Sequence, residues 1–465
     1  MSAAAFPEGL LLAYYGDDFT GSTDALEAIT AAGVPTVLFL RPPTEEMRAR
    51  FPAVRCIGLA GSSRGRTPEW MDAELPAVFA RLAALGAPVL HYKICSTFDS
   101  APHVGSIGRA IDIGVRQMGG RWSPMVVGVP RLGRYQMFGN LFVTWNGTTY
   151  RLDRHPTMSR HPVTPMDEAD LSRHLARQTE RRIALIDMAE IRAGKAQARQ
   201  EALAGADTPV VLIDVMDEAT LAEAGRLIWE NRGGGIFSAS SSGLQYALAA
   251  HWRSLGLLPA TPGLPQAEGV ETIAVVSGSC SPVTAAQIAH ARANGFHTER
   301  LDLPRALADA SREAETARAV DVALNALKRG KSPVIFSAEG PDDPAVTGFD
   351  ATAAALGLSR ADAARRVGSV LAEIMRRMVE SRAVRRVTVA GGDSSGEVME
   401  ALNVFALDIA AGLAPGAPLC RAHSDDAIYD GLEVVLKGGQ MGPAEFFTTV
   451  RDGTPRGAAP RSRSA

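Results

Sequence analysis

Residues 387–398 read Val-Thr-Val-Ala-Gly-Gly-Asp-Ser-Ser-Gly-Glu-Val. Small and β-branched residues run directly into Gly391 and Gly392, and a helical-looking stretch follows at 397–402. This order predicts a buried strand, a tight glycine turn and the N-terminus of a helix. Such a junction presents unpaired backbone N–H groups and the positive end of a helix dipole, and glycine lets a ligand approach the backbone closely. The ligand that it favours is an anion, most often a phosphate.

Two further turns rich in Gly and Ser follow expected strands in the same half of the chain, at 277–282 and 437–442. Three such turns in one domain favour a phosphate-binding site over three unrelated loops. The site is not a P-loop, because the Gly-Lys-Ser at 330–332 leads into an expected strand instead of a helix.

The composition is that of an ordinary globular protein. The chain has 465 residues, of which 46% are hydrophobic and 21% charged, which allows two or more domains with their own cores. The net charge of −3 indicates neither nucleic acid nor an anionic membrane as a partner. No apolar run is long enough to span a bilayer and no leader pattern opens the chain. The four cysteines form no C-x-x-C pair, so we expect a cytoplasmic protein.

Apolar runs alternate with helical segments along the chain, which is the signature of α/β architecture with a mainly parallel sheet. The expected N-terminal strands include 10–15, 54–60, 89–93 and 125–129, and a helix is expected to open at 166–168. Three of these strands end in polar clusters: Asp17-Asp18, Ser62-Ser63-Arg64 and Lys93 to Asp99. Parallel strands place such loops at one edge of the sheet. The stretch 130–166 looks instead like a hairpin followed by a long loop.

A linker with several prolines divides the chain. We expect a first domain at 1–256, the linker at 257–269, a second domain at 270–450 and a disordered tail at 451–465.

The adjacent carboxylates of Asp17 and Asp18 suit a base that orients a hydroxyl. An Asp before a helix also suits an N-cap, so we expect one of the two to cap while the other acts. Arg64 and Lys93 suit the binding of a carboxylate, although a lone basic residue is more often a solvated surface charge.

Metal binding and serine hydrolysis are two other chemistries that residues of this sequence suggest. His155 and His161 lack the spacing of a metal site, so no metal-binding residues are predicted. Two stretches, 61–65 and 392–396, match the G-x-S-x-G elbow of serine hydrolases around Ser63 and Ser394, with His423 available to Ser394 by chain order. A serine hydrolase therefore stays open as an alternative, as does a protein that binds a small acid without chemistry.

The motifs together resemble those of the four-carbon acid sugar kinase family, formerly a domain of unknown function. The resemblance runs along nearly the whole chain, through the segments 17–21, 62–64, 93–100, 160–166, 277–281, 391–396 and 437–439. It implies two α/β domains with mainly parallel sheets and an active-site cleft between them. The first domain of such kinases binds the sugar acid, the second binds ATP with Mg²⁺, and a terminal hydroxyl is phosphorylated.

Residue roles follow from the resemblance by position. The catalytic residues would be Asp17 and Asp18, and the substrate-binding residues would be Ser62, Arg64, Lys93, Asp99, Arg160 and His161. The nucleotide-binding residues would be Ser277, Ser279, Ser281, Gly391, Gly392, Asp393, Ser394, Gly438 and Gly439. The partners would be the acid and ATP, and a homo-oligomer is compatible with the sequence.

The chain departs from the commonest pattern of the family at Tyr14-Tyr15-Gly16, across 119–152 and at 438–442. These departures favour a divergent branch, for which we expect a 3-oxo-isoapionate kinase instead of a threonate, erythronate or 3-oxo-tetronate kinase.

Overall fold

The computed structural model describes residues 6–145, 147–161, 163–260 and 263–454. The chain divides into two compact units between Gly263 and Leu264, inside the predicted linker. We call them the N-terminal and the C-terminal unit. The last helix, α17 (Phe446–Asp452), reaches into the predicted tail, and the rest of that tail from residue 455 on lies outside the described residues.

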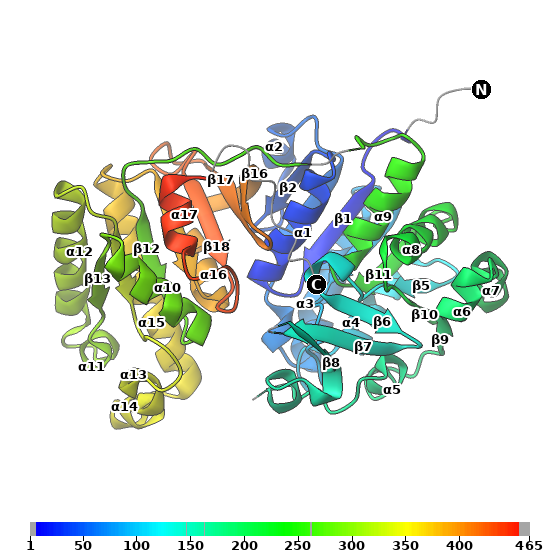
Figure 1. The fold of residues 1–465 in the computed structure, drawn as a ribbon, viewed down its shortest axis with the longest axis horizontal. Helices are drawn as coiled ribbons and strands as arrows, with labels where there is room; N and C mark the ends of the chain where they lie inside the picture. The colour runs from blue at the N-terminus through cyan, green and yellow to red at the C-terminus, as the bar shows by residue number, and fades with distance from the viewer. Residues whose placement is uncertain (1–5, 146, 162, 261–262, 455–465) are drawn as a thin grey trace. The chain divides into compact units, whose positions relative to one another are not determined.

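The N-terminal unit is organised around a five-stranded parallel sheet (Figure 1). Its strands run in the order β11 (Ile236–Ser240), β4 (Val89–Lys93), β1 (Leu12–Gly16), β3 (Cys56–Ala60) and β2 (Thr36–Phe39). The central strand β1 pairs in parallel with β3 on one side and β4 on the other. The prediction that these three strands end at one edge is therefore confirmed.

Four of the longer helices of this unit begin at a residue whose side chain caps them, whereas α7 (Ala196–Leu203) and α9 (Gly243–Ser254) have no side-chain cap. The longer helices are α1 (Phe19–Ala31), α3 (Pro68–Ala83), α4 (Ile107–Met118), α7 (Ala196–Leu203), α8 (Glu218–Glu230) and α9 (Gly243–Ser254), and the short ones are α2 (Glu45–Ala49), α5 (Leu171–Leu175) and α6 (Met188–Arg192). Asp18, Thr67, Ser106 and Asp217 cap α1, α3, α4 and α8 with their side chains. A side-chain oxygen at this position satisfies an N–H group that the helix cannot.

Two smaller sheets complete the N-terminal unit. One is parallel, with the order β5 (Ser123–Met125), β10 (Val210–Ile213), β9 (Ile183–Ile186). The other is antiparallel, with the order β6 (Arg134–Met137), β7 (Asn140–Trp145), β8 (Thr148–Arg151), where the sequence predicted a hairpin and loop. Four 3₁₀ turns lie in the loops: η1 (Ser63–Gly65), η2 (Pro130–Leu132), η3 (Leu152–Arg154) and η4 (Met158–Arg160).

Two predicted elements of this unit are wrong in their bounds. The strand expected at 125–129 ends at Met125, because the next N–H, that of Val126, donates to the Ser240 hydroxyl (2.9 Å) instead of to a strand carbonyl. The helix expected to open at 166–168 begins at Leu171, because Asp170 is the residue whose carboxylate accepts the first free N–H groups.

The two tyrosines of β1 fit because glycines face them. A Cβ at Gly58 would come within 2.1 Å of the Tyr14 ring, and a Cβ at Gly61 within 2.0 Å of the Tyr15 ring. Tyr15 stacks on Tyr92 of β4, with ring centroids 6.0 Å apart. The large side chains at Tyr14 and Tyr15 are thus matched by glycines in β3 and directly after it.

The C-terminal unit contains a seven-stranded sheet. Its order is β16 (Val404–Ala414), β17 (Ala417–Ser424), β18 (Glu433–Lys437), β15 (Arg386–Ala390), β12 (Ala274–Ser277), β14 (Pro333–Phe336) and β13 (His297–Arg300). The strands from β18 to β13 are parallel, whereas β16 and β17 form a long antiparallel hairpin that joins β18. No expectation from the sequence covered that hairpin.

Helices pack against this sheet and close its core (Figure 1). The helices that contact its strands are α10 (Pro282–Ala293), α12 (Arg312–Lys328), α15 (Arg360–Glu380), α16 (Gly392–Ala401) and α17. The remaining helices, α11 (Leu303–Leu307), α13 (Pro344–Thr347) and α14 (Phe349–Ala355), pack on other helices. Ile288 of α10 and Phe446 and Phe447 of α17 pack with the strand residues Val275 and Val435 in one buried cluster.

Candidate functional site

The polar residues at the edge of the N-terminal sheet are held together by the backbone. The Asp17 N–H donates to the carbonyl of Lys93 (2.9 Å), and the Arg64 N–H donates to the carbonyl of Asp17 (2.9 Å). The ends of β1, β3 and β4 are therefore tied to one another, so the structure brings three of the predicted site residues into one cluster.

Arg64 binds both neighbouring carboxylates. Its Nη2 and Nε lie 2.7 Å and 3.1 Å from the two carboxylate oxygens of Asp17, and Nη2 also lies 2.7 Å from Asp18 Oδ1. Asp17 is 2% exposed. Burial raises the pKa of Asp17 against the opposing charge of Arg64. The pKa of Arg64 is raised because the two carboxylates outweigh its own burial, so the guanidinium stays charged.

Asp18 is the residue of the pair that caps α1. Its carboxylate accepts hydrogen bonds from the Gly21 N–H (2.9 Å) and the Thr20 hydroxyl (2.8 Å). Burial would raise the pKa of Asp18, but Arg64, Lys93 and these hydrogen bonds lower it overall. Gly21 is needed at this turn, because a Cβ there would lie 2.3 Å from Asp18 Oδ1 and 3.2 Å from Lys93 Nζ.

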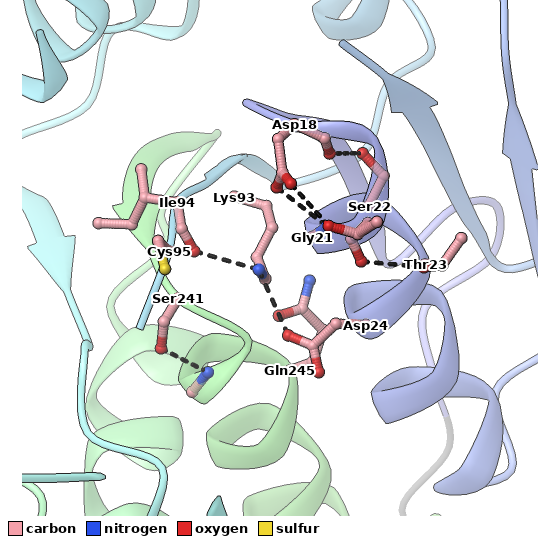
Figure 2. A network of polar contacts seen from close by, with 12 residues as sticks. Asp18, Gly21, Ser22, Thr23, Asp24, Lys93, Ile94, Cys95, Ser241 and Gln245 are labelled. Atoms are coloured by element: carbon pink, nitrogen blue, oxygen red, sulfur yellow. Dashed lines mark hydrogen bonds and ion pairs between the residues drawn. The ribbon is translucent and has the colours of Figure 1, made fainter. Parts of the chain in front are cut away.

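Lys93 points from the end of β4 toward the first turns of α1 (Figure 2). It is 2% exposed, and its Nζ lies 3.3 Å from Asp24 Oδ2 and 3.1 Å from the carbonyl of Ile94. Gln245 of α9 lies beside this pair (Figure 2). The Gln245 amide donates to His91 Nδ1 (2.9 Å), while its buried Oε1 has no hydrogen-bond partner among the described residues.

The other predicted substrate residues are not bonded to this ion-pair network, although Asp99 lies within electrostatic range of Cys95 and Arg134. Asp99 accepts from the Thr97 hydroxyl (2.8 Å), and His161 Nδ1 accepts from the Thr164 N–H (3.1 Å). Ser62 and Arg160 are exposed. Within the described part of the chain, no hydrogen bond or ion pair links any of the four to Asp17 or Arg64.

Arg134, at the start of β6, is a candidate that the sequence analysis did not assign. Its Nη1 donates to the carbonyls of Leu132 (2.8 Å) and Thr144 (3.4 Å), whereas its Nε is buried without a partner. Burial lowers the pKa of Arg134, opposed by Cys95, Asp24 and Asp99. Arg134 is therefore within electrostatic range of the Lys93–Asp24 pair, yet no described carboxylate forms an ion pair with it. The only signal in the sequence was the pair Arg131 and Arg134 in an irregular stretch.

The three glycine- and serine-rich turns meet at one edge of the C-terminal sheet. The Gly278 N–H donates to the Ala390 carbonyl (3.0 Å), and the Gly391 N–H donates to the Lys437 carbonyl (3.0 Å). The turns after β12, β15 and β18, which contain the predicted residues Ser277, Gly391 and Gly438, are thus neighbours.

The turn after β15 is shorter than predicted. Gly391 is the N-cap, with φ of 128°, and α16 begins at Gly392, so Asp393 and Ser394 already lie in the first helical turn. The first helical hydrogen bond, from the Ser395 N–H to the Gly391 carbonyl (3.1 Å), leaves the three preceding N–H groups available to a ligand. An anion at a helix N-terminus is stabilised by such donors and by the helix dipole.

The turns after β12 and β18 are close-packed. Ser281 caps α10 by accepting from the Val283 N–H (3.1 Å), and the Ser279 hydroxyl accepts from Thr284 Oγ1 (3.1 Å). A Cβ at Gly439 would lie 2.6 Å from Ser279 Oγ. Glycine is therefore required where these two turns touch.

Lys437 ends β18 beneath the turns and is fully buried. Its Nζ donates to Thr284 Oγ1 (3.0 Å), and burial lowers its pKa to about 7. The described residues supply no carboxylate that pairs with it. A buried cation without a counter-ion fits a site whose ligand is an anion.

Neither serine elbow has the contacts of a hydrolase nucleophile. Ser63 is buried and shares a hydrogen bond with the Tyr92 hydroxyl (2.8 Å) instead of with a histidine. His423 lies 3.4 Å from Asp408 on the β16–β17 hairpin, and no hydrogen bond between His423 and Ser394 occurs in the described part of the chain. Among the same residues there is no group of three or more His, Cys, Asp or Glu side chains that could hold a metal ion.

Comparison with known families agrees with this division of the chain. A model of a sugar-binding N-terminal domain matches residues 12–248, and a model of a nucleotide-binding C-terminal domain matches residues 274–447. The fold and the site thus define a two-domain protein with one unit for a sugar and one for a nucleotide. The chain belongs to the four-carbon acid sugar kinase family, as its motifs indicated.

Three relatives along almost the whole chain are sugar-acid kinases by name. The chain is 69% identical to the 3-oxo-isoapionate kinase of Paraburkholderia graminis, over 98% of this chain and 97% of that protein. It is 31% identical to the 3-oxo-tetronate kinase of Methylobacterium radiotolerans (95% and 99% covered) and 30% identical to that of Pseudomonas fluorescens (94% and 96% covered).

The similarity to solved structures is evidence for the fold alone. A crystal structure from Salmonella typhimurium LT2 matches with a TM-score of 0.76 at 24% identity, covering 94% of this chain and 98% of that one. Haemophilus influenzae protein HI1011 matches with a TM-score of 0.70 at 23% identity (94% and 99% covered). In the described part of the chain, no helix is both long and apolar enough to cross a membrane.

Proposed function

We propose that this sugar-acid kinase transfers the γ-phosphoryl group of ATP to a hydroxyl of 3-oxo-isoapionate. The observation that carries the choice of acid is the 69% identity to a 3-oxo-isoapionate kinase across almost the whole chain, against about 30% to the 3-oxo-tetronate kinases. Under this proposal the N-terminal unit binds the acid and the C-terminal unit binds ATP. The enzyme is proposed to work in the cytoplasm, and a homo-oligomer is compatible with it.

Asp17 is the proposed base. Asp18 is occupied as the cap of α1 and its pKa is lowered, whereas the pKa of Asp17 is raised by burial. In the reaction the substrate hydroxyl oxygen bonds to the γ-phosphorus, the bond from that phosphorus to the bridging oxygen of ADP breaks, and the hydroxyl proton passes to Asp17. Phosphoryl transfer needs such positioning more than covalent help.

Arg134 is the proposed partner of the substrate carboxylate. Arg64 and Lys93 already face aspartates at 2.7 Å and 3.3 Å, so their part is to hold Asp17 and Asp24 in place. Arg134 keeps its Nε without an acceptor, and the edge of a guanidinium formed by Nε and Nη2 matches a carboxylate bidentately. Asp24 and Asp99 nearby suit the hydroxyl groups of the acid.

The residues of the C-terminal unit fit the phosphates of ATP. The free N–H groups of the first turn of α16, the Ser279 and Ser281 turn and Gly439 are the proposed contacts. Mg²⁺ is proposed to neutralise the phosphate oxygens while keeping mostly water ligands, as is common for this ion.

The test is an assay of ADP release with MgATP against a panel of purified acids: 3-oxo-isoapionate, the 3-oxo-tetronates, and the D- and L-forms of threonate and erythronate. We expect turnover with 3-oxo-isoapionate at a kcat/KM at least tenfold above that of any other acid. An Asp17→Asn preparation made in parallel controls for contaminating kinases. Preferred turnover of a 3-oxo-tetronate would overturn the assignment of the acid, and ATP binding without turnover of any acid would overturn the kinase.

A further inference from the structure

Lys437 is not among the proposed ATP contacts, although it ends β18 next to the turns that are proposed to bind the nucleotide. We propose that Lys437 is the buried cation of the nucleotide site and acts on the ATP phosphates through the hydroxyls of Thr284 and Ser279. The inference rests on the proposed ATP site and adds to it a residue that the nucleotide does not touch directly.

The first argument is the isolation of the charge. Lys437 is among the largest side chains that are fully buried in the chain. Its ammonium has three N–H donors, of which one donates to Thr284 Oγ1 at 3.0 Å. Burying an ammonium without a counter-ion is costly. A stable protein keeps such a group only where something repays the cost, and an anionic ligand is the direct way to do so.

The second argument is the chain of hydroxyls that leads away from Lys437. Thr284 Oγ1 accepts from Lys437 and lies 3.1 Å from Ser279 Oγ and 2.9 Å from the carbonyl of Gly439. A threonine hydroxyl has one proton to donate. When it donates to Ser279, the Ser279 hydroxyl keeps its own proton for a phosphate oxygen. Hydrogen bonds in such a chain polarise one another, so the charge of Lys437 strengthens the last donor.

The third argument is that Lys437 also links the turns through its backbone. Its carbonyl accepts from the Gly391 N–H at 3.0 Å, and the turn after it contains Gly439, which touches Ser279. Each of the three turns therefore contacts Lys437 or its hydrogen-bond partner.

The charge state of Lys437 should respond to the nucleotide. Burial lowers the pKa of Lys437 to about 7. Above that pH, most molecules therefore carry Lys437 in its neutral form. The titratable and charged groups on the elements packed around β18 are His290 and Arg292 of α10, Asp393, Glu397 and Glu400 of α16, Arg386 of β15, and Cys420, Arg421 and His423 of β17. None of them forms an ion pair with Lys437 in the described structure. An incoming polyanion favours the charged form, so binding should take up a proton.

Isothermal titration with a Mg²⁺-bound non-hydrolysable ATP analogue tests this in the full chain. Titrations at pH 8 in buffers of different ionisation enthalpy report the protons taken up per nucleotide. We expect uptake approaching one proton for the wild type. For Lys437→Met we expect no uptake and at least a tenfold rise in Kd. Lys437→Arg stays charged at this pH, so it should bind the analogue without uptake.

Two matched variants separate the relay from nonspecific effects. Thr284→Val removes the hydroxyl next to Lys437 and should weaken binding while keeping the proton uptake. Lys331→Met removes an exposed lysine of the same unit and should change neither quantity. Thermal melts establish that each variant is folded.

The outcomes distinguish this inference from the function on which it rests. If the wild type binds the analogue without proton uptake, or if Lys437→Met keeps both uptake and affinity, the role of Lys437 is wrong and the ATP site stands. If the folded wild type binds no nucleotide, the proposed function falls and the inference falls with it.

Discussion

Arg64 binds both carboxylate oxygens of Asp17, with Nη2 2.7 Å from Oδ1 and Nε 3.1 Å from Oδ2. Asp17 is buried at this point, and burial alone favours the protonated acid. The guanidinium keeps the carboxylate available as a base and fixes its direction. The adjacent Asp18 contacts the same guanidinium, but its two carboxylate oxygens accept the hydrogen bonds that cap α1.

Exchange of the two aspartates in turn should separate these roles. Asp17→Asn should lower kcat by a factor of about 100 or more, the scale of a lost general base, while Kd for ATP stays unchanged. Asp18→Asn should lower kcat less and mainly affect stability, because Asn retains much of the capping ability of Asp. Steady-state kinetics with both substrates, together with thermal melts, provide the readout.

If Asp18→Asn loses more turnover than Asp17→Asn at equal stability, Asp18 is the base and the assignment is reversed. If both variants turn over like the wild type, neither carboxylate accepts the proton.

Truncation of Arg134 should affect the acid and spare the nucleotide. Arg134→Ala should raise KM for the acid at least tenfold, because it removes a charge-assisted pair whose net value is about 1.5–3 kcal/mol, and KM for ATP should not change. Arg134→Lys should recover only part of the loss, since an ammonium cannot bind a carboxylate bidentately. Arg116→Ala, at an exposed arginine of α4, is the control. Equal rises in KM for both substrates would contradict a carboxylate contact.

Some of these site residues could be predicted from the sequence and others could not, for a physical reason. Asp17 and Arg64 follow strands that the periodicity identified and Lys93 ends one, so parallel pairing alone predicts that they meet. Arg134 lies on a small antiparallel sheet, and its approach to Asp24 depends on tertiary packing that no local pattern encodes. The β16–β17 hairpin is a different case, because its strands are joined by the local turn Pro415-Gly416, a signal that the sequence does contain. The start of α16 shifted because Gly391, and not a residue nearer 397, has the positive φ that ends the turn.

A methyl group at Gly439 should damage nucleotide binding specifically. The new Cβ would lie 2.6 Å from Ser279 Oγ and 3.1 Å from the Ser281 Cβ, so either the Ser279 hydroxyl rotates away from Thr284 or one of the two turns shifts. Gly439→Ala should raise KM for ATP about tenfold with little change in KM for the acid. Gly234→Ala is the matched control, because a Cβ there meets no atom within 4 Å. Unchanged ATP kinetics in folded Gly439→Ala would remove this turn from the site.

The dependence of the free energy of unfolding on pH should also reveal the charge state of Lys437. Its folded-state pKa is lowered to about 7, below the ordinary value of about 10.4. Between these two values the unfolded chain binds the extra proton, so stability rises with pH across this window, by on the order of 1 kcal/mol per pH unit from this group. Lys437→Met lacks this contribution.

In the absence of nucleotide, Lys437→Met should therefore melt above the wild type at pH 7, and the gap should narrow as the pH approaches 10. Comparing the variant with the wild type at each pH cancels the other titrating groups. A gap that stays constant from pH 7 to 10 would mean that Lys437 is charged in the folded protein throughout, and that its ammonium already has an anionic partner before ATP arrives.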